Sequence, residues 1–89
     1  MGHTKPENLE DLAKELSEIR GLKGPTEKSP GIFYYRAAGF LHFHDKGRRR
    51  WADVKVHGDW TELKIDFESI PSQRRSFLSR VKKAHKDFS

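Results

Sequence analysis

The sequence predicts an α+β fold, in which two helices cover one face of an antiparallel sheet to form a two-layer sandwich. The sheet is expected to have three strands, or four if the first strand is divided. Three observations predict this fold: apolar residues at helical spacing near each end of the chain, and between them the run 40–67, where apolar and polar residues alternate around two glycine turns. Two amphipathic helices and a sheet with one apolar face bury their apolar surfaces against one another. We expect one small domain over residues 1–89, in the order α-β-β-β-α.

The first helix is expected at about residues 5–20. Pro6 suits a first helical turn, and Gly21 stands where a helix commonly ends. Between them, four apolar residues recur at helical spacing: Leu9, Leu12, Leu16 and Ile19. Residues 21–30 follow as a loop, because they hold glycine, serine and two prolines.

The sheet is expected over about residues 31–67. Its first part is open to two readings, a single strand bent by a bulge near Gly39 or a short strand that turns into a second one at residues 37–39. We expect the bent strand. The next turn, at residues 45–48, sets His42 opposite Trp51 and places Arg50 on the apolar face, from which its side chain is expected to reach water at the end of the sheet.

The last hairpin carries the clearest register. A two-residue turn that begins at Gly58 fits the type II′ preference for glycine in the first position. It sets Lys55 opposite Glu62 and Asp53 opposite Lys64, so that opposite charges face each other twice. The last helix is expected at about residues 70–86, with one apolar side and one basic side.

The composition narrows the functional classes. The 89 residues hold 18 Lys and Arg against 13 Asp and Glu, a net charge of +5, and residues 31–59 and 60–89 each carry +3. A positive field favours polyanions such as nucleic acid. Without cysteine there is neither a disulfide nor a thiolate metal site, and without a long apolar run we expect no membrane partner and a cytoplasmic location.

The sheet face turned away from the helices, here called the outer sheet face, is the first candidate site. Aromatic side chains on a sheet can stack on bases while cations meet phosphates. The expected ligand-binding residues, including the basic hairpin at residues 46–50, are Phe40, Trp51, Trp60, Arg48, Arg49, Arg50, Lys55 and Lys64.

A second route to nucleic acid uses the last helix. The expected order α-β-β-β-α resembles that of double-stranded-RNA-binding domains, which implies a basic helix lying over phosphates. The family's Lys-Lys-x-Ala-Lys signature is absent, and residues 72–76 read SQRRS in its place. The resemblance implies four candidate contacts: Arg74, Arg75, Lys82 and Lys83.

Metal binding and catalysis have weaker support. His42 and His44 lie two apart on a strand and so share a face, with Asp53 or Asp66 as an oxygen ligand, a set that suits zinc, nickel or iron. A histidine beside a carboxylate also resembles a general base, but no nucleophile stands near it. No glycine-rich phosphate loop is present, so we expect no cofactor and no catalytic residues.

Self-association is the remaining alternative. Burying Phe40, Trp51 and Trp60 across a two-fold axis would compensate for the thin core of so short a chain. The leading hypothesis is therefore a small basic binding module without catalytic activity whose ligand is nucleic acid. The alternative is a homodimer that uses the outer sheet face as its interface.

Overall fold

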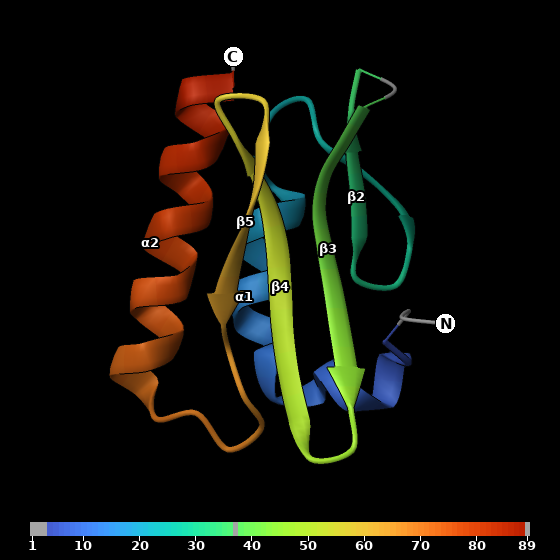
Figure 1. Ribbon diagram of the computed structural model, residues 1–89, viewed down its shortest axis with the longest axis vertical. Helices are drawn as coiled ribbons and strands as arrows, with labels where there is room; N and C mark the ends of the chain where they lie inside the picture. The colour runs from blue at the N-terminus through green and yellow to red at the C-terminus, as the bar shows by residue number, and fades with distance from the viewer. Residues whose placement is uncertain (1–3, 37, 89) are drawn as a thin grey trace.

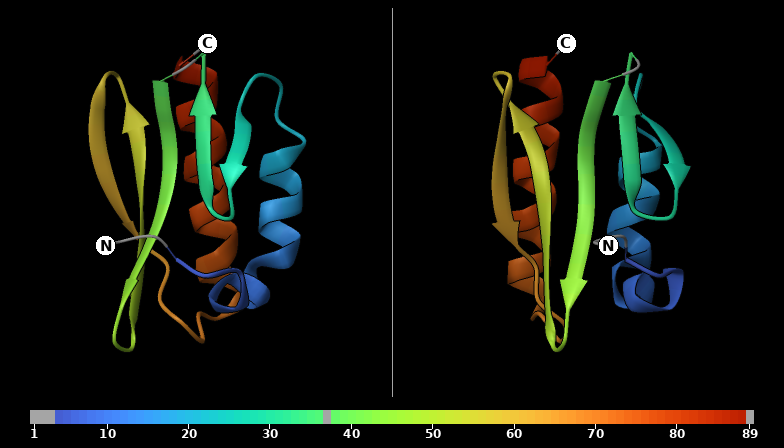
Figure 2. Two further views of the ribbon diagram at one scale, coloured as in Figure 1. Left: turned by 90° about the vertical axis from the view of Figure 1, so that its right-hand side faces the viewer. Right: turned by 45° about the vertical axis from the view of Figure 1, so that its right-hand side comes forward.

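A five-stranded antiparallel sheet, with its strands in chain order, forms one layer of the protein, and two helices form the other (Figure 1). The computed structural model describes residues 4–36 and 38–88. Figure 2 shows both helices on the same face of the sheet. The elements are η1 (Pro6–Leu12), α1 (Ala13–Arg20), β1 (Thr26–Ser29), β2 (Ile32–Tyr35), β3 (Ala38–Lys46), β4 (Arg49–Val56), β5 (Asp59–Lys64) and α2 (Pro71–Phe88).

The expected fold class is confirmed, but the expected strand number is too low. The first extra strand, β1, lies in the segment expected to be a loop and pairs antiparallel with β2. The second arises because the chain divides into β2 and β3, so the single bent strand that we expected is wrong. With five strands between the helices, the topological resemblance to a three-stranded RNA-binding domain also fails.

A bulge lies between β2 and β3. Phe33 pairs with Leu41, but the next residue, Tyr34, pairs with Gly39, so Phe40 is the extra residue. Phe40 turns into the core and is fully buried. The expectation that it lies on the outer sheet face is therefore wrong, and Gly39 takes a place on that face instead.

Both long hairpins keep the expected faces but differ in register by two residues. In the first, Lys46 pairs with Arg49 around a two-residue turn, and this sets His42 opposite Asp53 and His44 opposite Trp51. The expected pairing of His42 with Trp51 is wrong. A shift of two residues leaves every side chain on its own face, because strand side chains alternate with a period of two.

In the second hairpin the turn residues are His57 and Gly58, whose φ angles of 50° and 86° fit a type I′ turn. Asp53 therefore faces Glu62, and neither of the two expected opposite-charge pairs forms across this hairpin. Lys55 pairs with Trp60 instead.

The core lies between the layers, and it includes one charged side chain. Arg50 is 1% exposed, so the expectation that it reaches water is wrong. Its Nε donates to the carbonyl of Ile65 at 2.7 Å, and its Nη atoms donate to the carbonyls of Asn8 (2.7 Å) and Asp66 (3.0 Å). Two further bonds, of 2.7 and 2.8 Å, reach the carboxylate of Asp11. All five guanidinium N–H groups thus have acceptors.

The hydrogen bonds that Arg50 donates also change the pKa of Asp11. The hydrogen bond from Arg50 outweighs the partial burial of Asp11 and holds the pKa of that carboxyl below its ordinary value of 3.8. Asp11 lies on η1 and Arg50 on β4, so the pair attaches the N-terminal helical segment to the sheet.

Among the described residues, no helix has both the length and the apolar character needed to cross a membrane.

Candidate functional site

The outer sheet face carries a connected group of aromatic rings. Trp51 stacks on His44 with 5.7 Å between ring centroids, and His44 lies 6.2 Å from His42. His42 in turn contacts Trp60 at 5.0 Å and Tyr34 at 5.9 Å. The rings therefore pack on one another, which is a form of cross-strand stabilisation.

Trp60 is the most exposed aromatic residue of this face, at 45%, yet its ring is also engaged. The Lys55 ammonium lies 4.4 Å from the ring centroid. A Cβ atom added to Gly39 would stand 3.0 Å from the six-membered part of the indole. The indole thus extends across β4 and covers the glycine that the bulge turns outward, and a stacked base would have to displace Lys55.

The middle of the outer sheet face is acidic. Asp53 lies directly opposite Glu62, and like charges in that position repel. His44 Nε2 lies 3.2 Å from the Asp53 carboxylate. Two carboxylates at this position work against phosphate binding, because they repel anions.

The histidine pair does not extend into a larger ligand set. His42 and His44 lie side by side as expected, and Asp53 approaches His44. Asp66 instead accepts a hydrogen bond from the Arg50 backbone N–H at 3.0 Å. Within residues 4–36 and 38–88, no group of three or more His, Cys, Asp and Glu side chains is arranged to hold a metal ion.

The remaining expected residues are dispersed. Arg48 and Arg49 are exposed at the β3–β4 turn, whereas Arg50 is buried and cannot contact a ligand on the surface. Lys55 and Lys64 lie on the outer sheet face, opposite Trp60 and Trp51 respectively. The structure does not bring these cations together into one basic surface.

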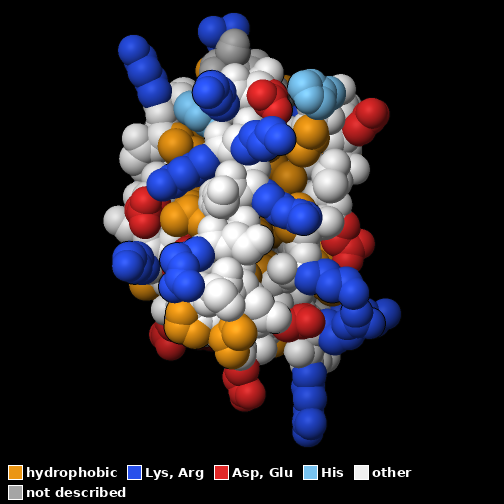
Figure 3. Space-filling model, turned by 90° about the vertical axis from the view of Figure 1, so that its left-hand side faces the viewer, with side chains coloured by type: hydrophobic (Ala, Val, Ile, Leu, Met, Phe, Trp, Pro, Cys, Tyr) orange, Lys and Arg blue, Asp and Glu red, His pale blue; other side chains and the backbone are white. Residues whose placement is uncertain are grey.

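A more strongly basic surface lies on α2. The side of this helix opposite the buried Phe77, Val81 and Ala84 carries exposed cations, here called the basic α2 face. Figure 3 shows Lys and Arg side chains spread over the side of the molecule that α2 presents, with hydrophobic side chains visible between them. The residues of the basic α2 face are Arg75, Arg80, Lys82, Lys83 and Lys86.

Most of this charge is not neutralised locally. Lys82 Nζ lies 2.8 Å from a Glu18 carboxylate oxygen. By contrast, Arg75, Arg80 and Lys83 form no ion pair with any residue that the structure describes. Three of the four candidates expected on the last helix are exposed, and the fourth, Arg74, turns toward the core with its Nε 3.8 Å from Glu15.

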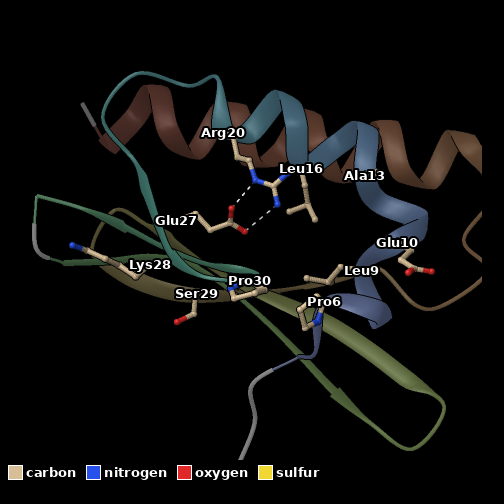
Figure 4. Close-up of a pocket in the computed structure, with 10 residues that line it drawn as sticks. All are labelled: Pro6, Leu9, Glu10, Ala13, Leu16, Arg20, Glu27, Lys28, Ser29 and Pro30. Atoms are coloured by element: carbon tan, nitrogen blue, oxygen red, sulfur yellow. Dashed lines mark hydrogen bonds and ion pairs between the residues drawn. The ribbon is translucent and has the colours of Figure 1, made fainter.

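A separate hollow of about 430 Å³ lies between β1 and the N-terminal helical segment (Figure 4). At one end Arg20 and Glu27 point toward each other and form two hydrogen bonds, of 2.6 and 3.2 Å. Although burial alone would raise the pKa of Glu27, the bonds from Arg20 and from the backbone N–H of Gly31 lower it. The polar groups at this end satisfy one another, so the pair serves to attach β1 to α1.

Comparisons with protein-family models, with curated proteins and with solved structures find no match to this chain. The sequence favours the outer sheet face over α2, because aromatic residues and cations gather on that face, whereas the α2 route depends on a topological resemblance. The helical spacing of residues 75–86 is the signal that identifies the stronger basic surface.

Proposed function

We propose that this protein is a binding module for nucleic acid, without catalytic activity, and that the basic α2 face contacts the phosphates. The observation that carries the proposal is the set of exposed cations on α2, three of which have no ion-pair partner among the described residues. Phosphate contacts made by Lys and Arg supply most of the affinity of sequence-independent nucleic-acid binding. The acidic centre of the outer sheet face favours α2 over the sheet as the contact surface.

The dimensions of α2 also support the proposal. Its 18 residues give a helix about 27 Å long, which is long enough to follow several consecutive phosphates. The exposed residues Ser72 and Ser79 lie between Arg75 and Lys82 on one side and Lys83 on the other, and Ser76 lies between Lys83 and Arg80. Small hydroxyl side chains let a backbone approach closely and can donate hydrogen bonds to phosphate oxygens.

Fluorescence anisotropy with labelled single-stranded and double-stranded DNA and RNA tests the proposal. We expect binding whose affinity falls steeply with salt, because each phosphate contact releases condensed counterions. The absence of binding to all four ligands at low salt would contradict the proposal.

Charge reversal locates the surface. The double variant Arg75→Glu with Lys83→Glu is expected to weaken binding and to lower the slope of log affinity against log salt by about two. The control, Lys5→Glu with Lys28→Glu, changes the net charge equally at exposed positions away from α2. If both variants lose the same affinity, only the net charge matters and the assignment to α2 is wrong.

A second candidate function, homodimerisation through the outer sheet face, is favoured by the exposure of Trp60. Burying such a ring in a two-fold interface would add apolar contact area. Sedimentation velocity over a range of concentrations decides it. A dimer that Trp60→Gln converts to a monomer supports this function, and a wild-type protein that stays monomeric excludes it.

A further inference from the structure

The two edges of the sheet differ in how they are protected. The edge strand β1 has four residues, an irregular register between Glu27 and Ser29, a lysine at position 28, and prolines at positions 25 and 30 on either side of it. Short length, bulges, lysine and proline are the features that keep an edge strand from pairing with another chain. The opposite edge, β5, has six residues in regular register with β4 and contains no proline.

The backbone groups at the β5 edge follow from the hairpin. A two-residue turn makes Val56 and Asp59 the first hydrogen-bonded pair, and hydrogen-bonded and non-hydrogen-bonded pairs then alternate along the ladder. The backbone N–H and C=O groups of Trp60, Glu62 and Lys64 therefore point away from β4. All three residues are exposed.

A groove, here called the edge groove, runs beside this edge between β5 and α2. It consists of two adjoining hollows, of about 400 and 240 Å³, which share Leu63 and Arg80 among their lining residues. Val56, Leu63 and Phe77 give it an apolar floor. Thr61, on the inner side of β5, remains exposed, and no hydrogen bond or ion pair between described residues joins β5 to α2.

The charge of the edge groove indicates what it can hold. Arg80 and Lys83 form its α2 wall and have no ion-pair partner among the described residues. Two acidic residues also line the groove. Asp87 lies at one end, where its carboxylate is 3.7 Å from His57, and Glu62 lies on β5 with its side chain on the outer sheet face. A second copy paired through β5 would bring two basic α2 faces to the same side of one sheet, whereas an acidic segment would neutralise them.

We propose that β5 and the edge groove bind an extended acidic peptide, which joins the sheet as a sixth strand. The peptide backbone pairs with the outward groups of Trp60, Glu62 and Lys64, as in other cases of strand addition. The side chains on its inward face alternate between apolar residues, which cover the floor, and acidic residues, whose carboxylates meet Arg80 and Lys83. This interaction is additional to the proposed nucleic-acid function, but it shares Arg80 and Lys83 with the basic α2 face, and only the β5 edge belongs to the peptide site alone.

The test uses Glu62→Pro, which removes one outward N–H without affecting the bonds between β4 and β5. The matched control, Glu62→Thr, removes the same charge but keeps the N–H. The probe is a fluorescein-labelled peptide with threonine at every odd position and with valine and glutamate in turn at the even positions, so that valine and glutamate share one face of the strand. We expect Glu62→Pro to bind it about tenfold more weakly than wild type, and Glu62→Thr to bind at least as well as wild type.

A second variant keeps the proposal testable if Glu62→Pro does not fold, which circular dichroism will show. Arg80→Glu with Lys83→Glu is expected to lose the glutamate peptide and to bind the same peptide with lysine in place of glutamate, here called the lysine peptide. The proposal is overturned if wild type does not bind the glutamate peptide, if it binds the lysine peptide equally well, or if Glu62→Pro has no effect. Nucleic-acid binding by Glu62→Pro should equal that of wild type, so the two proposals can fail separately.

Discussion

At the scale of single residues, Arg50 shows how a buried charge is accommodated. A buried guanidinium is costly unless its N–H groups are all bonded, and here each has an acceptor. The acceptors come from η1, from the residue after β5 and from the following loop. Arg50, a charged residue on an apolar strand face, therefore connects three other segments of the chain to β4.

Replacing Arg50 with methionine is expected to lower the free energy of unfolding by about 3 kcal/mol, because the carbonyls that it satisfies lose their donor. Urea denaturation followed by circular dichroism measures the change. Arg49→Met is the control, since its side chain is exposed next to Arg50, and it should change stability by less than about 0.5 kcal/mol. Equal losses in the two variants would contradict the assigned role.

The ion pair also predicts a dependence on pH. The pKa of Asp11 is lower in the folded protein than in the unfolded chain, mainly because Arg50 donates hydrogen bonds to it. Its contribution to stability is therefore present above the unfolded pKa and is lost as the pH falls below about 4. The difference in unfolding free energy between wild type and Asp11→Asn should narrow in that range. A constant difference from pH 7 to acid would show that the carboxylate charge has no part in it.

At the scale of elements, the bulge between β2 and β3 explains the aromatic content of the outer sheet face. The bulge sends Phe40 inward and leaves Gly39 outward, and Trp60 from β5 covers the glycine. An aromatic ring over a sheet glycine compensates for the missing side chain. The Trp60 ring therefore stabilises the sheet, independently of any ligand that binds to the outer sheet face.

A double-mutant cycle tests this packing. Gly39→Val is expected to cost about 1–2 kcal/mol in the wild type, because its side chain would overlap Trp60. In a Trp60→Ala background the cost should be smaller by at least about 0.5 kcal/mol. Additive effects in urea denaturation would mean that the ring does not rest on Gly39.

The β4–β5 turn offers a stabilising substitution. His57 has a φ of 50°, and asparagine tolerates this left-handed conformation better than histidine does. His57→Asn should therefore raise the free energy of unfolding by about 0.5 kcal/mol, seen as a higher thermal midpoint. His57→Ala is the control, because alanine is not favoured there, and a gain of the same size in that variant would contradict the explanation.

The hairpins also show where prediction from the sequence stops. Except for Phe40 at the bulge, alternation assigns the residues of these strands to the correct faces. A shift of two residues preserves every face, however, so alternation cannot choose between the registers. Opposite charges favour the wrong one, because the structure sets Asp53 against Glu62. The choice between the two registers depends on whether His57 takes a positive φ angle. Strand β1 could not be predicted for another reason: a short polar segment between prolines resembles a loop.

At the scale of the whole molecule, the main positive and negative charges lie on different surfaces. The basic α2 face lies on one side, and the carboxylates of Asp53 and Glu62 lie at the centre of the outer sheet face. Helix positions and total charge are readable from the sequence, so the basic α2 face could be predicted. The edge groove could not, because it depends on how far α2 lies from β5, and that distance is set by packing under β4.

The excess positive charge predicts how stability responds to salt. With a net charge of +5, self-repulsion opposes the folded state, and salt screens it. The thermal midpoint should rise between about 0.02 and 0.3 M sodium chloride, and the rise should be smaller for Arg75→Glu with Lys83→Glu. A midpoint that falls with salt in the wild type would show that attractive surface pairs outweigh the repulsion.

The position of Arg50 also bears on how the protein opens. Its bonds to Asn8 and Ile65 span 42 and 15 residues of the chain. If the N-terminal segment or the stretch after β5 detached alone, the guanidinium would lose the acceptors that this segment supplies. Local opening of either segment is therefore costly, and we expect η1 and the stretch after β5 to exchange their amide hydrogens as one cooperative unit.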